Sequence, residues 1–194
     1  AALLELAQRS HTLTESEVLA QSLELAARLT GSATSYLFLA VAETGQLELA
    51  ACQDGSAASH ELSVLTRWRG VPPSETALYE CADRQQPVVR DLPEGTGVLR
   101  QAGLPGTLSR QACVPMLDGA RLAGVLLLAG KAQTYAEEDL HHATQVTEAL
   151  ARLLRRRRSD AEVVSAMDHM ERVMLGVVES LATLAETQDA CKAG

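Results

Sequence analysis

The C-terminal part of the chain carries an apolar stripe with heptad spacing. Its seven members follow one another at alternating four- and three-residue intervals: Val163, Met167, Met170, Met174, Val177, Leu181 and Leu184. This alternation keeps one narrow apolar face along an α-helix, as the a and d positions of a coiled coil do. The residues between them, including Asp168, Glu171 and Arg172, suit a solvated flank. We therefore expect a long helix whose seam packs in parallel against the same seam of a second chain.

An alternative is that this helix folds back and buries the stripe on its own domain. Three heptads are close to the minimum length for assigning a coiled coil. A solitary domain, however, seldom ends in a long helix whose apolar face points away from its core. The stripe therefore favours a homodimer.

The same helix is expected to begin well before the seam. Thr134 and Glu137 have the spacing of a capping box. A core-facing stripe follows, formed by Leu140, Ala143, Val146, Leu150 and Leu153. Neither proline nor glycine occurs between Thr134 and Gly176. The helix is therefore predicted to pass the four arginines at 155–158 and enter the seam after a phase slip near residues 154–160.

Signals for helix ends are also complete near the N-terminus. Thr14 and Glu17 form a capping box, and Leu13 and Val18 are placed as a hydrophobic staple. Gly31 suits the left-handed position that ends a helix. These residues predict a helix from Thr14 to Gly31.

Two hairpins are predicted from turn residues between apolar runs. Residues 35–42 and 46–53 flank a short loop with a glycine, and residues 110–117 and 121–130 flank Asp118-Gly119. Other elements are expected as short helices at 3–10, 60–70 and 76–85, a brief strand at 87–92, and a long loop at 93–109. This order predicts an α+β fold, in which helices pack on an antiparallel β-sheet and a long coiled-coil helix follows.

Composition limits the classes of function. The chain has 194 residues, 46% of them hydrophobic, which is enough for one domain and an extension. Its 17 basic and 25 acidic residues give a net charge of −8, which disfavours nucleic-acid binding. The longest apolar run, at 122–130, is too short to cross a bilayer, and no signal peptide is recognisable. We expect a cytoplasmic protein without a membrane segment in this chain.

The cysteines and histidines do not form a metal-ligand motif. Four cysteines are widely and unevenly spaced: Cys52, Cys81, Cys113 and Cys191. Reduced thiols are therefore expected. The histidines are scattered, with no carboxylate–histidine cluster at ligand spacing. The sequence requires no metal or other cofactor.

The stretch 109–154 resembles the C-terminal half of a GAF domain. The matching residues are Val114-Pro115 before a turn, Gly124-Val125-Leu126 in the next strand, and Glu138-Asp139 with Leu140 opening a helix. Residues 86–91 are similar to the family's central strand. The resemblance spans residues 15–155 and implies a sensory domain. It leaves residues 1–14 as an N-terminal linker and 156–194 as a signalling and dimerisation helix.

The end of the chain is similar to the opening helix of HD-GYP cyclic di-GMP phosphodiesterases. Leu181, Ala182, Glu186, Asp189, Ala193 and Gly194 match that pattern, whereas Gln188, Ala190, Cys191 and Lys192 depart from it. The resemblance implies that the chain stops just before a catalytic domain, so that this chain itself holds no catalytic residues.

Three other functions stay open. The chain could be the sensor of a histidine kinase, with His169 as the phosphorylated residue, although Met170 separates it from Glu171. It could serve only as a dimerisation module with a filled pocket. It could also resemble the free methionine sulfoxide reductases, which are GAF-fold enzymes, if a helix at 76–85 brings Cys81 close to Cys113.

If the domain senses a small ligand, the resemblance places the pocket between the sheet and residues 60–100. Trp68, Tyr79, Cys81 and Arg90 lie in or beside that segment and are the candidate pocket residues. A tryptophan flanked by two arginines suits an anionic or aromatic ligand, but it also suits packing at a helix end.

Overall fold

The computed structural model describes residues 12–41, 44–54, 77–91 and 110–192, with side chains up to residue 176. Residues 1–154 form one compact unit and residues 155–194 a second one. The helices predicted at 3–10 and 60–70 and the loop at 93–109 lie outside the described residues.

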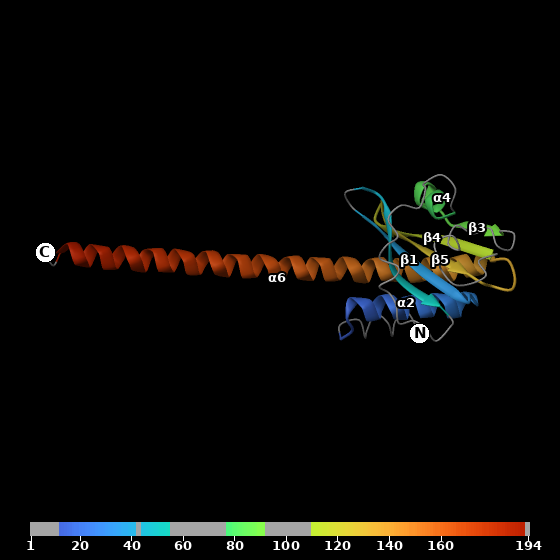
Figure 1. Cartoon of the computed structure of the whole chain (residues 1–194), viewed down its shortest axis with the longest axis horizontal. Coiled ribbons are helices and arrows are strands. Elements are labelled where there is room, and N and C mark those ends of the chain that lie inside the picture. Colours follow the sequence, from blue (N-terminus) through green and yellow to red (C-terminus); the bar gives the residue numbers. More distant parts are fainter. Residues whose placement is uncertain (1–11, 42–43, 55–76, 92–109, 193–194) are drawn as a thin grey trace. The chain divides into compact units, whose positions relative to one another are not determined.

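The first unit is built on a five-stranded antiparallel sheet (Figure 1). Its strands are β1 (Thr34–Ala40), β2 (Leu47–Asp54), β3 (Val88–Asp91), β4 (Arg110–Asp118) and β5 (Arg121–Ala129). The spatial order is β2-β1-β5-β4-β3. Both predicted hairpins are present, and β1 pairs with β5 to join them. The antiparallel α+β architecture is thus confirmed.

Helix α2 (Glu15–Thr30) has the ends that the sequence predicts. The Thr14 side chain accepts a hydrogen bond from the Glu17 backbone N–H, and the Glu17 carboxylate accepts one from the Thr14 N–H at 2.7 Å. Gly31 ends the helix with φ +67°, a conformation that costs little without a Cβ. These reciprocal bonds satisfy backbone groups that the first turn leaves open.

One face of the sheet packs against α2 and the first turns of α6 (Glu137–Lys192). The buried side chains of this cluster include Val18, Leu23, Leu37, Val114, Leu126, Leu128, Val146 and Leu150. The predicted stripe on α6 therefore faces the core, with Ala143 and Val146 fully or nearly fully buried. As predicted, α6 continues without interruption through the four arginines.

Helix α6 begins two residues later than a cap at Thr134 would place it. The helix begins at Glu137, and the Asp139 carboxylate accepts the Ala136 N–H at 2.8 Å and a bond from Lys131 Nζ at 2.5 Å. Burial alone would raise the pKa of Asp139, but these two bonds, together with the charge of Lys131, lower it. The Thr134 hydroxyl instead donates to Asp91 at the end of β3. The Thr134 hydroxyl is thus bonded to a residue 43 positions away, and Asp139 accepts the N–H ahead of the first turn in place of the predicted Thr134–Glu137 box.

Gly124 on β5 allows β1 and β5 to approach closely. It lies opposite Leu39 in the β1–β5 pairing and opposite Met116 in the β4–β5 pairing. A Cβ at this position would overlap the Phe38 carbonyl oxygen and lie 3.1 Å from the Met116 methyl carbon. Because the first of these atoms belongs to the backbone, the overlap could be relieved only by moving a strand.

We predict that Gly124→Ala lowers the free energy of unfolding by about 1–3 kcal/mol, the usual range for overpacking. Chemical denaturation followed by circular dichroism would measure it. Gly176→Ala is the matched control, because a Cβ there meets nothing within 4 Å. Equal denaturation midpoints for the two variants would contradict the role given to Gly124.

Candidate functional site

The second face of the sheet carries a separate apolar cluster. Its buried members are Tyr36, Phe38, Leu47, Ala77, Leu78, Cys81, Val88, Cys113, Val125, Leu127 and Ala129. Alternation along β5 places Val125 and Leu127 on this face and Leu126 and Leu128 on the face of α2. Helix α4 (Ala77–Arg84) packs over β3, β4 and β5 on this side. We call this surface the α4 face.

An ion-pair cluster fastens α4 to the edge strand β3. The Arg90 guanidinium donates a short hydrogen bond to the Glu80 carboxylate, which also pairs with Arg84 one turn later at 2.7 Å. The hydrogen bond from Arg90 lowers the pKa of Glu80, with a further contribution from the charge of Arg84. Arg84 and Arg90 are 66% and 42% exposed, so solvent screens both pairs and their stabilisation is small. Only the Arg90–Glu80 pair joins α4 to β3, and it adds to the buried packing of Ala77, Leu78 and Cys81 against the sheet.

Three of the four candidate pocket residues lie on these two elements. Cys81 is fully buried in the α4 face, and Tyr79, two residues earlier on α4, is partly buried, which raises its pKa. Arg90 lies on β3 and is engaged by Glu80. Trp68 lies outside the described residues. Sequence reasoning missed Glu80: its spacing from Arg84 signals a helical pair, but its bond to Arg90 depends on how α4 packs.

Cys81 and Cys113 belong to the same buried cluster. Helix α4 packs over β4, so the packing condition for bringing these two residues together is met. Burial raises the pKa of Cys81 to about 12 and that of Cys113 well above its ordinary value. Because the thiolate is the nucleophile, both thiols are held in their unreactive form. Among the described residues, no three histidine, cysteine, aspartate or glutamate side chains gather to hold a metal.

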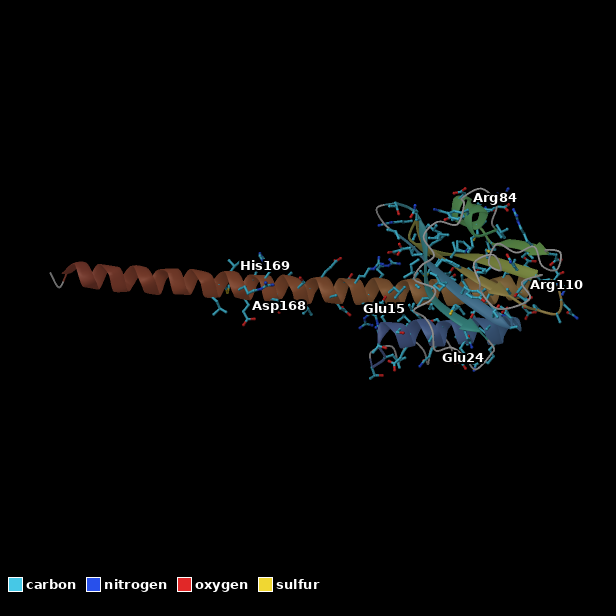
Figure 2. The ribbon with its side chains drawn as sticks, in the orientation of Figure 1. Glu15, Glu24, Arg84, Arg110, Asp168 and His169 are labelled. Atoms are coloured by element: carbon cyan, nitrogen blue, oxygen red, sulfur yellow. The ribbon has the colours of Figure 1, made fainter. Side chains whose placement is uncertain are left out.

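The second candidate surface is the exposed apolar part of α6 in the unit 155–194. Four members of the predicted seam are strongly exposed in this chain: Val163 at 54%, Met167 at 66%, Met170 at 63% and Met174 at 62%. Val177, Leu181 and Leu184 continue the helix, but their side chains lie outside the description. Asp168 and His169 also extend from this helix (Figure 2), and both are exposed.

The exposed apolar surface is wider than the seam. Val164, Val173 and Leu175 are 58%, 52% and 58% exposed. At 100° per residue they flank the seam on both sides. The heptad count missed them because it selects one residue per half-repeat. No helix in the described ranges combines the length and apolarity that a membrane span requires.

Comparison with known proteins identifies the fold. The sequence model of the GAF domain matches residues 12–155. No functionally curated protein matches the chain.

Solved structures of several kinds share this fold. The free methionine-R-sulfoxide reductase from Neisseria meningitidis is 14% identical over 82% of this chain and 89% of that chain, with a TM-score of 0.61. A GAF domain/HD domain protein from Geobacter sulfurreducens is 16% identical over 74% and 94%, with a TM-score of 0.59. The GAF domain of a protein named as a sensor histidine kinase, from Pseudomonas syringae pv. tomato, is 18% identical over 85% and 90%, with a TM-score of 0.51. At these identities the likeness establishes the fold alone.

We predict that iodoacetamide leaves Cys81 and Cys113 unmodified in the native protein, because their burial suppresses the thiolate. Raising the pH to about 9 should not change this, since the pKa of Cys81 is about 12. Mass spectrometry of peptides would locate the label, with the partly exposed Cys52 as an internal control. Rapid native labelling of Cys81 or Cys113 at neutral pH would revive the reductase alternative.

Proposed function

Because the chain belongs to the GAF domain family, we propose that it is a sensory domain that binds a small ligand at the α4 face and relays the binding event through a dimeric α6. GAF domains are typically sensory or regulatory, and their structures occur in signalling proteins such as the one from Pseudomonas. We place the ligand on this side because Tyr79, Cys81 and Arg90, three of the four candidate pocket residues, lie on α4 and β3, next to the apolar cluster of the α4 face.

The observation that carries this proposal is the continuity of α6. One helix contributes Ala143, Val146 and Leu150 to the domain core and then presents the exposed seam beyond residue 160. Because the backbone hydrogen bonds of α6 are continuous from its first turns onward, a displacement of these turns has a direct path to the later ones. The later turns expose apolar side chains of the kind that a second helix would cover.

For the output we propose a cyclic di-GMP phosphodiesterase domain of the HD-GYP class. The similarity of residues 181–194 to the opening helix of that class supports it. So does the Geobacter protein, in which a GAF fold and an HD domain occur together. The histidine-kinase alternative keeps one supporting fact, the exposure of His169 on α6. Incubation of the full-length protein with radiolabelled ATP distinguishes the two, because label on His169 would favour the kinase.

We predict that the double substitution Met174→Glu, Val177→Glu separates the dimer and leaves the GAF domain folded. Each buried apolar side chain contributes about 1.5–3 kcal/mol, so the dissociation constant should rise by at least about 100-fold. Sedimentation equilibrium measures the dimer, and circular dichroism monitors the fold.

The matched control for this test is Ser165→Glu, His169→Glu. It places two new carboxylates on the opposite side of the same helix, at positions that are already exposed. The control should dimerise like the unmodified chain. An unchanged dissociation constant for the seam variant would show that the seam is not the interface.

We also predict that Trp68 is shielded by the pocket. It is the only tryptophan in the chain, so intrinsic tryptophan emission reports this residue alone. A side chain in the pocket should emit at shorter wavelength than free tryptophan and resist quenching by acrylamide. Emission and quenching equal to those of the urea-unfolded chain would remove Trp68 from the pocket.

A further inference from the structure

Two charged residues occupy the positions at which the seam would continue toward the start of the second unit. Counted back from Val163 with the same alternating spacing, the stripe reaches Asp160 and then Arg156, and the predicted phase slip then falls between Leu153 and Arg156. Both residues belong to the unit 155–194 and precede its exposed apolar members. The face of α6 that carries the apolar seam therefore begins with a positive residue, Arg156, and a negative residue, Asp160.

Within one chain these two side chains interact weakly. Arg156 Nε lies 3.9 Å from Asp160 Oδ2, and the side chains are 63% and 72% exposed. Exposed helical pairs four residues apart contribute only about 0.3–0.5 kcal/mol. A basic residue ahead of an acidic one is also the less favourable order along a helix. Both groups thus keep most of their hydrogen-bonding capacity available for another partner.

A second copy of the chain, paired through the seam as proposed above, would supply that partner. In a parallel coiled coil each d-position side chain enters a hole on the facing helix, and the a position one turn later forms part of that hole. With Val163 at a d position, Arg156 is a d residue and Asp160 the following a residue. Arg156 of each chain thus meets Asp160 of the other. The twofold axis makes two such crossed pairs.

We propose that these crossed Arg156–Asp160 pairs fix the parallel, in-register alignment of the dimer. This rests on the proposed function, in which α6 is the dimer interface. A slip by one heptad would place Arg156 against Val163 and Asp160 against Met167, leaving both charges against apolar side chains, with no opposite charge on the facing helix. An antiparallel arrangement would place Arg156 of one chain far from Asp160 of the other, because both residues lie at the same end of the seam. The apolar residues alone discriminate less well, since methionine adapts to many surroundings.

Two single substitutions and their mixture test the pairing. Asp160→Arg leaves four positive charges in the two layers, and Arg156→Asp leaves four negative ones. Each homodimer should dissociate at least about tenfold more readily than the unmodified dimer. Mixing the two variants restores opposite charges in both crossed pairs, so native mass spectrometry should show mixed dimers well above the half that random exchange gives. The double variant Arg156→Asp, Asp160→Arg should dimerise like the unmodified chain.

The controls use the same residue types on the other side of the helix. Asp168→Arg and Arg172→Asp change charges that lie off the seam and are exposed, so their mixture should exchange at random. If the unmodified chain dimerises and the 156/160 variants also mix at random, the crossed pairing is overturned while the seam interface stands. If the unmodified chain is monomeric at every concentration, the dimeric relay of the proposed function fails together with the pairing.

Discussion

The architecture depends on the pairing of β1 with β5. Each hairpin alone is a two-stranded ribbon, which is marginal in water. Six residue pairs, from Thr34–Ala129 to Leu39–Gly124, join the two ribbons into one sheet. This pairing places β5 at the centre, where Val125 to Ala129 are buried on both faces. Gly124 permits the close approach at one end of it, because a side chain there would collide with the neighbouring strand.

The sheet is buried on both faces, and different elements pack on each face. One side holds α2 and the start of α6, and the other forms the α4 face. Neighbouring residues on β5 point to opposite faces of the sheet, so a displacement of this strand would shift side chains in both apolar clusters. The edge strand β3 makes a second connection: Arg90 holds α4 through Glu80, and Asp91 accepts a hydrogen bond from Thr134, just ahead of α6. Contacts at the α4 face are thus continuous with contacts at the start of the helix.

The sequence predicted what local chemistry determines. The ends of α2, both hairpins and the uninterrupted α6 follow from capping residues, turn glycines and spacing, and the structure confirms them. The start of α6 and the engagement of Arg90 were not predictable in this way. Asp91 and Thr134 are 43 residues apart, and Glu80 and Arg90 are 10 apart on different elements. Such bonds form only once the sheet has brought the segments together, so a local signal such as the Thr134–Glu137 capping box is overridden.

The exposed face of α6 could pack against a partner helix in more than one rotational position about the helix axis. Val164 and Val173 flank the seam, and Leu175 lies further round, so turning the helix about its axis exchanges some apolar contacts for others. A seam flanked by apolar residues defines its rotation less sharply than one flanked by charges, which set partner choice and orientation. In the proposed relay, alignment along the axis is a separate requirement, because two output domains would have to stay level for a rotation to act on both. Charged residues at one end of the seam, Arg156 and Asp160, would hold the two helices in axial alignment. The apolar part of the seam would remain free to repack.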